Sequence, residues 1–331
     1  MEQVLRTLLP FMLGGMLLSQ IGQRLEPISD RGVRTAARML TKWVIWVAMP
    51  SLVLTKIHAL PSFSLTHPEV YLPVSQPWVH FTLVFLLLGW LGKRYQWSAA
   101  TVGALTLTIG LGNTSFVGIP LLNAILGPDS IPTGILLDQL GSFLILTTTG
   151  ITLAHAFRAE ARGGARTRKR KRDWVLNPLK FPPFAALLLA FTLRGTEYPE
   201  PLARGLANLA STLTPAALLS VGLSIRLSAL KRPEIRRLLL LGVALKLLVL
   251  PAIEGGFYIL TGSLLPSFDP LVRMTLLLEA SMATMIMAGV VAAEAELEPD
   301  LAQLMVGVTI PISLLSVPAW HWVWSQLLSS S

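Results

Sequence analysis

The sequence has 331 residues, of which 53% are hydrophobic and only 14% carry a charge. A soluble domain carries charges at about a quarter of its positions, so the composition indicates a polytopic membrane protein and disfavours a soluble all-helical one. The chain has no cysteine, so neither a thiolate metal site nor a redox compartment can be argued.

The charged residues lie in short segments between apolar runs of about 20 residues, the length that a helix needs to cross a bilayer. We expect ten such runs to be transmembrane helices in an all-α fold. The first run reads as a retained span, because no basic cluster precedes it and no small-residue cleavage signature follows it. The ten runs are residues 4–22, 36–57, 73–92, 98–126, 131–156, 178–194, 202–226, 235–261, 268–293 and 300–327.

Lysine and arginine gather in alternate loops of this ten-span arrangement. Of the 27 basic residues, 21 fall within residues 24–42, 93–94, 158–180 and 226–237, which share one side. Because cytoplasmic loops carry an excess of basic residues, we expect this side to be the cytoplasm. The sequence therefore predicts a multi-pass protein of the cell membrane with both termini on the non-cytoplasmic side.

A basic linker, residues 158–176, divides the chain into two halves of five expected spans, residues 1–157 and 177–331. Its run from Arg158 to Arg172 is interpreted as a solvated linker that sets topology, and anionic lipid headgroups are the alternative ligand. Nucleic acid is disfavoured, because no aromatic residue interrupts the basic run. Halves with an odd number of spans must insert in opposite senses, which predicts two inverted five-helix repeats.

The fourth run, residues 98–126, contains an interruption that a membrane helix does not normally have. Three glycines weaken the helix, Pro120 removes an amide donor, and Asn113, Thr114 and Ser115 add polar side chains at one depth. In lipid, broken backbone is tolerated only where it is buried in protein or lines a wet cavity. We therefore expect these four residues to form the substrate site; the alternative is that small residues only permit close helix packing.

The ninth run contains a counterpart of this interruption. Pro50 in the second run and Pro215 in the seventh are 165 residues apart, and the same offset carries Asn113 to a position beside Glu279. The sequence thus predicts crossing broken helices in spans four and nine. The polar residues expected to contact substrate in the ninth run are Ser281 and Thr284.

Ionisable residues inside spans are costly and by default suggest function. Lys246 lies near the middle of the eighth run, with Glu254 further along it, and Asp138 and Glu279 lie in the fifth and ninth runs. We expect Asp138, Lys246 and Glu279 to couple charge or carry a proton. The alternatives are a structural ion pair for Lys246 and interfacial positions for the two carboxylates. If Lys246 lies close to Asp138, it would hold that carboxylate charged.

No catalytic, metal or cofactor site is expected. The five histidines are interpreted as lying at span ends and in loops without ligand spacing, and no zinc-protease, nucleophile-elbow or phosphate-loop motif is present. An enzyme is therefore disfavoured. The histidines are His58, His67, His80, His155 and His321.

The segment from Asn113 to Leu122, NTSFVGIPLL, resembles the fourth-span signature of the auxin efflux carrier family, which includes plant PIN-type transporters and bacterial carriers. Weaker matches follow in the expected order along almost the whole chain. They are Asp138-Gln139, Asn177-Pro178, Pro215 with Ser220-Val-Gly-Leu, Lys246-Leu with Pro251, and Pro299-Asp300.

This resemblance implies ten spans in two inverted repeats, crossing broken helices, and elevator-type export of organic anions. The chain departs from PIN-type members in the ninth span, where Ala283 and Ala288 stand at positions that we align with prolines. We expect a secondary transporter that exports a small organic anion, auxin-like or a dicarboxylate, and needs no cofactor. The alternative is a channel or ligand sensor that uses the same cavity, and a homodimer is left open.

Overall fold

The computed structural model describes residues 2–24, 27–58, 68–163, 182–193, 196–261 and 269–329. Within these residues the chain is almost entirely helical and contains no strand beyond one isolated antiparallel bridge. Only residues 158–163 of the expected basic linker are described, and they begin inside α9 (Ile151–Ala161). The remainder of the linker and the start of the sixth apolar run lie outside the described residues.

Six helical stretches are long and apolar enough to cross a membrane, and four further apolar helices are shorter. The structure therefore shows a helical protein with several candidate spans, while the ten-span inverted repeat stays a prediction. The six long stretches are Gly32–Lys56, Val70–Tyr95, Pro128–Ala161, Glu200–Ser224, Pro233–Leu260 and Pro299–Leu328. The shorter helices are Pro10–Ile21, Ala99–Gly110, Thr114–Leu126 and Pro182–Thr192.

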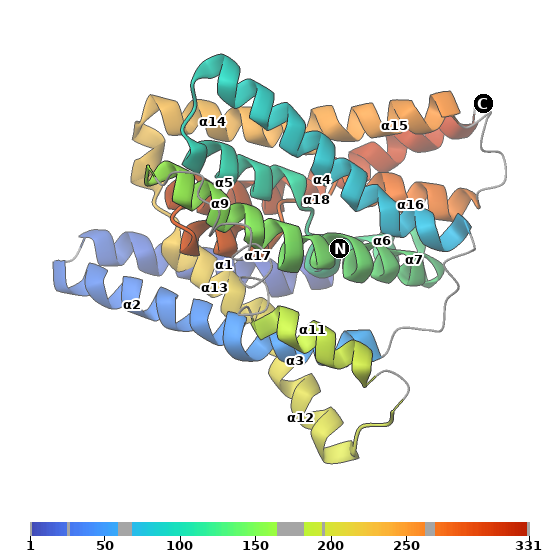
Figure 1. Ribbon diagram of the computed structural model, residues 1–331, viewed down its shortest axis with the longest axis horizontal. Coiled ribbons are helices and arrows are strands. Elements are labelled where there is room, and N and C mark those ends of the chain that lie inside the picture. Colours follow the sequence, from blue (N-terminus) through green and yellow to red (C-terminus); the bar gives the residue numbers. More distant parts are fainter. Residues whose placement is uncertain are drawn as a thin grey trace.

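Six helices form a first helix group, which fills the lower part of Figure 1. In this group α1 and α2 pack on α13, and α11 and α12 pack on α3. The helices are α1 (Glu2–Arg24), α2 (Pro27–Trp43), α3 (Met49–His58), α11 (Pro182–Thr192), α12 (Glu200–Ser211) and α13 (Leu213–Ser224).

The closest helix crossing in the first group is that of α1 and α13. A Cβ at Gly15 would lie 2.7 Å from the carbonyl oxygen of Leu219, and one at Gly222 would lie 2.3 Å from that of Met12. Real Cβ atoms do not approach a backbone this closely, so both positions require glycine. Small residues at a helix interface let two backbones touch, as is common between membrane helices.

The remaining described helices form a second helix group, above the first in Figure 1. Here α5 packs between α4, α9 and α17, and α18 packs on α14 and α17. The groups meet chiefly where α13 contacts α17 and α18. The second group contains α4 (Pro68–Tyr95), α5 (Ala99–Gly110), α6 (Ile119–Leu126), α7 (Ile131–Leu136), α8 (Phe143–Ile145), α9, α14 (Pro233–Ala244), α15 (Leu250–Thr261), α16 (Pro270–Ala280), α17 (Ile286–Glu294) and α18 (Pro299–Ser329).

Both expected interruptions are present, and they hydrogen-bond to each other. The backbone is extended after α5 and again between α16 and α17, and Gly112 forms the antiparallel bridge with Thr284. The amide of Asn113 donates to the carbonyl of Ala283 at 2.7 Å, and that of Met285 donates to Leu111 at 3.0 Å. Each interruption therefore satisfies backbone groups that the other exposes, as broken helices inside a membrane protein require.

The ninth-span interruption forms without a proline because neighbouring helices hold it open. The backbone amide of Thr284 donates to the hydroxyl of Thr309 at 3.0 Å, and the Thr284 hydroxyl donates to the carbonyl of Thr108 at 2.8 Å. These contacts come from α18 and α5. They replace the local helix-breaking effect that a proline would supply.

Candidate functional site at the crossing

Two small cavities flank the paired interruptions, and each has room for the centre of about one water molecule. The first, here called the charged cavity, has a volume of about 20 Å³, little more than the 10–15 Å³ that one water needs. The second, here called the asparagine cavity, has the same volume. The charged cavity is lined by polar residues that include Gln76, His80, Thr114, Lys246, Glu254 and Glu279.

The asparagine cavity lies between the two helix groups. Its polar lining comes from Asn113, Ser115, Asp138 and Gln139 in the second group. Apolar residues of both groups complete it, so a molecule placed there would contact both groups. The apolar lining includes Met49, Leu52 and Val53 of α3, Leu213 of α13, and Met285 and Met287 at the start of α17.

The Asp138 carboxylate lies directly against the interruption in span four. It accepts hydrogen bonds from the hydroxyl of Thr114 at 2.5 Å, from the hydroxyl of Ser115, and from the amide of Gln139 at 2.5 Å. Asp138 is buried in a π-helical turn, Leu137–Ser142, and such turns occur frequently at functional sites. The structure therefore joins one expected coupling residue to two expected substrate residues.

Asn113 presents a hydrogen-bond donor that nothing in the described chain accepts. Its side-chain oxygen accepts from the amide of Phe116 at 3.2 Å and so caps the π-helical turn Thr114–Gly118. Its side-chain nitrogen is buried without a partner among the described residues, and the residue is only 1% exposed. A buried unpaired polar group costs about 1–3 kcal/mol, so this donor suits a bound acceptor.

Lys246 and Glu279 line the charged cavity on the other side of the crossing. Lys246 lies in the π-helical turn Leu245–Val249 and is 1% exposed. Among the described residues it has no ion pair within 4 Å, and its ammonium lies beside Gly112. The sequence left open whether Lys246 pairs with Asp138; the structure places it instead in a cavity with Glu254 and Glu279.

Glu279 is held tightly by the π-helical turn of span four. A Cβ at Gly118 would lie 2.7 and 2.8 Å from the two carboxylate oxygens of Glu279, so a larger residue there requires the carboxylate to move. Both oxygens are buried and have no hydrogen-bond partner among the described residues. The Glu279 side chain is therefore enclosed in protein at the crossing.

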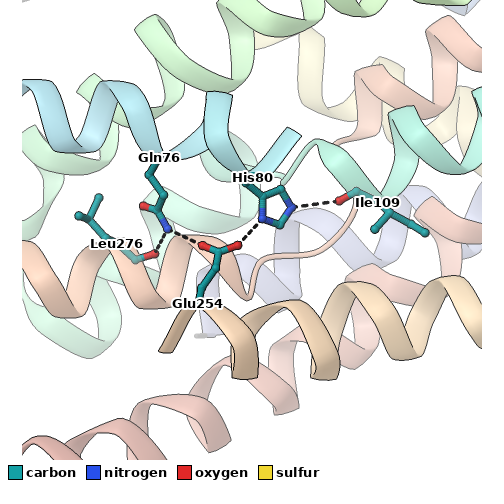
Figure 2. A network of polar contacts seen from close by, with 5 residues as sticks. All are labelled: Gln76, His80, Ile109, Glu254 and Leu276. Carbon is teal, nitrogen blue, oxygen red and sulfur yellow. Dashed lines mark hydrogen bonds and ion pairs between the residues drawn. The ribbon is translucent and has the colours of Figure 1, made fainter. Parts of the chain in front are cut away.

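A buried network that the sequence did not predict connects α4 to α15 (Figure 2). His80 bonds through Nδ1 to the Glu254 carboxylate, and its Nε2 lies 3.4 Å from the carbonyl oxygen of Ile109. The Gln76 amide donates to Glu254 at 2.8 Å and to the carbonyl of Leu276 at 3.1 Å.

His80 was wrongly assigned to a span end or loop. It lies well inside α4, at 9% exposure, because the helix begins at Pro68 and continues to Tyr95. The signal that could have found it is the four-residue spacing of Gln76 and His80, which places both side chains on one helix face.

Three expected substrate residues do not line either cavity. Pro120 lies inside the helix Thr114–Leu126, just after its π-helical turn, and the interruption at Gly112 and Asn113 precedes it by several residues. The missing amide of Pro120 therefore does not create the interruption, contrary to expectation. The hydroxyls of Ser281 and Thr284 donate to the carbonyls of Leu278 and Thr108, so both stabilise the backbone there.

The arrangement offers a hydrogen-bond donor, hydroxyls and a buried cation around one crossing, without a metal centre. In the part of the chain that the structure describes, no cluster of three His, Asp or Glu side chains is placed to hold a metal ion. The half-helices Thr114–Leu126 and α17 both begin at the crossing. Helix starts carry a partial positive charge and favour bound anions.

Comparison with known proteins decides the class of the chain. Residues 33–321 match the model of a family described as membrane transport protein. The chain belongs to this family. Its members are auxin efflux carrier-like permeases, which confirms the resemblance found in the fourth span.

Two relatives of this family member cover nearly its whole length. One is an uncharacterized transporter of Methanothermobacter thermautotrophicus, 28% identical over 310 residues, which are 92% of this chain and 94% of the relative. The other is an uncharacterized transporter of Methanocaldococcus jannaschii, 28% identical over 296 residues, 87% of this chain and 89% of the relative. The family member is thus similar to uncharacterized transporters over most of its length.

Proposed function

We propose that this family member is a secondary carrier that exports a small organic anion across the cell membrane by alternating access. The observation that carries the proposal is the buried, unpartnered side-chain nitrogen of Asn113 beside two half-helix starts. A carboxylate would accept from this donor and would be favoured by the partial positive charge of those helix starts. An auxin-like acid or a dicarboxylate is the proposed substrate class.

The small volume of both cavities supports a carrier over the alternative, a channel. Each cavity holds about one water at present, so an organic anion needs a larger opening. The asparagine cavity lies between the helix groups, and separation of the groups would enlarge it. We propose that the second helix group moves against the first, as in an elevator-type carrier.

Asp138, Lys246 and Glu279 are proposed to couple transport to charge. Substrate at Asn113 would contact the turn that binds Asp138, and the same turn encloses Glu279. An inside-negative potential alone favours anion export by about 2.3 kcal/mol per charge at 100 mV. A coupled proton would be an addition to this driving force rather than a requirement.

Flux measurements on reconstituted protein test the proposal. Proteoliposomes should show saturable flux of labelled malate, malonate or indole-3-acetate, and substrate on the far side should accelerate uptake. Acceleration by far-side substrate distinguishes a carrier from a channel, because a channel has no site that must return. Flux without saturation or acceleration would favour the channel. If a broad panel of organic anions gives no flux above that of empty liposomes, the proposed transport of organic anions is refuted.

A further inference from the structure

A third cavity lies at the opposite end of the interface between the two helix groups. It has a volume of about 940 Å³, within the range of sites that bind small molecules. We call it the arginine cavity, after Arg34, Arg38 and Arg226 in its lining. The other polar and charged residues that line it are Ser19, Thr35, Thr41, Ser224, Glu294, Glu296, Asp300 and Gln303.

The charges around this cavity leave an excess of positive charge. Two of its three carboxylates are bound by arginines outside the lining. Glu296 accepts from Arg158 and Arg162, both at 2.5 Å, and Asp300 accepts from Arg232 at 2.5 Å. Besides Arg34, five arginines thus surround three carboxylates, a local excess of two positive charges: Arg38, Arg226, Arg158, Arg162 and Arg232. An excess of positive charge around a cavity raises the local concentration of anions.

The arginine cavity and the asparagine cavity lie at two levels of the same helices. Three helical stretches contribute lining residues to both cavities. They are α2 continued by α3, α13, and α17. On the first stretch, Thr41 lines the arginine cavity and Met49 lines the asparagine cavity. Eight residues of helix rise about 12 Å, and the intervening Val44 and Ala48 are fully buried.

The inner wall of the arginine cavity is polar and incompletely satisfied. Thr41 and Ser220 share a hydrogen bond of 2.7 Å between their hydroxyls. Gln303, which also lines the cavity, is only 5% exposed, and its side-chain oxygen has no partner among the described residues. Thr41 and Gln303 therefore add neutral polar side chains to the charged lining.

We infer that the arginine cavity is an access site that binds the small organic anion before it reaches the crossing. Arg38 and Arg226 supply the attraction, and the buried plug of Val44 and Ala48 separates this site from Asn113. The positive-inside prediction places the cavity on the cytoplasmic side, which is the loading side of an exporter. The inference rests on the proposed function for its substrate class, and its test does not require transport.

The absence of cysteine in the natural chain allows a direct test. Ser224→Cys places one thiol in the cavity wall, and Ser98→Cys places a control thiol at the exposed N-cap of α5, outside the cavity lining. Each is labelled with two membrane-impermeant methanethiosulfonates, one anionic (sulfonatoethyl) and one cationic (trimethylammonioethyl). In water, a unit charge about 8 Å away changes the ratio of the two rates about fivefold. We expect Ser224→Cys to prefer the anionic reagent at least about tenfold, relative to a free thiol.

Two variants and one control assign this preference to the arginines. Arg38→Gln and Arg226→Gln should each reduce the ratio about fivefold. Arg204→Gln, which removes an exposed arginine of α12 that pairs with Glu200, should leave it unchanged. An anionic preference equal to that of Ser98→Cys, or one unaffected by both cavity variants, would overturn the inference. So would labelling of Ser224→Cys only from the side opposite the basic loops.

Protection identifies the occupant. Millimolar malate, malonate or indole-3-acetate should slow labelling of Ser224→Cys in vesicles of phosphatidylcholine alone. If none of these acids slows the labelling of Ser224→Cys, the cavity does not bind a small organic anion and the inference is wrong. The same conclusion follows if labelling is slowed only by phosphatidylglycerol in the bilayer. Protection with no measurable flux would instead refute the proposed transport and leave the binding site in place.

Discussion

The contact between Gly118 and Glu279 gives the sharpest test of the crossing. In Gly118→Ala the new Cβ would lie 2.7 and 2.8 Å from the Glu279 oxygens and 3.1 Å from their carbon. The ordinary contact distance is about 3.5 Å or more, and overpacking of this kind costs about 1–3 kcal/mol. The carboxylate must move, so we expect lower stability and slower transport. Thermal unfolding in detergent should show the loss as a lower Tm, by at most about 2–4 °C per kcal/mol.

A double-mutant cycle isolates this contact from other effects of alanine. If the clash with Glu279 causes the loss, Gly118→Ala should cost close to nothing in the Glu279→Ala background, because the clashing atoms are gone. Gly89→Ala in α4 is the matched control, since its Cβ would meet nothing within 4 Å, and its stability should stay equal or rise slightly. An equal cost of Gly118→Ala in both backgrounds would refute the geometry argued here.

Four further outcomes are expected. Asn113→Ala should abolish flux while insertion and Tm stay nearly unchanged, and loss of folded protein would show a structural role instead. With voltage clamped by potassium and valinomycin, a pH gradient should drive accumulation of the substrate in proteoliposomes. Asp138→Asn should remove this accumulation and leave downhill exchange intact. If the natural protein accumulates no substrate, proton coupling is refuted. His80→Ala should lower Tm, because it leaves the buried Glu254 carboxylate without its nearest partner, and an unchanged Tm would contradict that pair. The hydrogen bond from Arg162, helped by Arg158, lowers the pKa of Glu296 below its usual 4.5. The ionised Glu296 therefore stabilises the fold fully above about pH 4.5, and this stabilisation disappears as the pH falls through the lowered pKa. Glu296→Gln should make Tm depend less on pH in this acid range.

Hydropathy alone predicted where most helices run. The expected runs 131–156 and 300–327 correspond closely to helical stretches Pro128–Ala161 and Pro299–Leu328. The interruption in span four was also predictable, because its glycines and polar residues are consecutive in the sequence and weaken the helix locally. Local composition is therefore sufficient to predict the helices and one of the two interruptions.

The second interruption depends on contacts that no local pattern contains. Thr284 is held by Thr108, which is 176 residues away, and by Thr309 on α18. The His80–Glu254 pair joins residues 174 apart for the same reason. A polar residue inside an apolar run signals that a partner exists, because burial without one is costly. It does not say which of the other buried polar residues is that partner.

The arrangement of these partners shows how the crossing can transmit substrate binding. The turn Thr114–Gly118 lies between the two cavities, since Thr114 donates to Asp138 on one side and Gly118 touches Glu279 on the other. Asn113 caps the same turn, and it also carries the unpartnered donor proposed for the anion. Any shift of Asn113 on binding must therefore move the contacts of both carboxylates. A single turn of five residues thus connects the proposed substrate group to the proposed coupling groups, without a longer pathway through the protein.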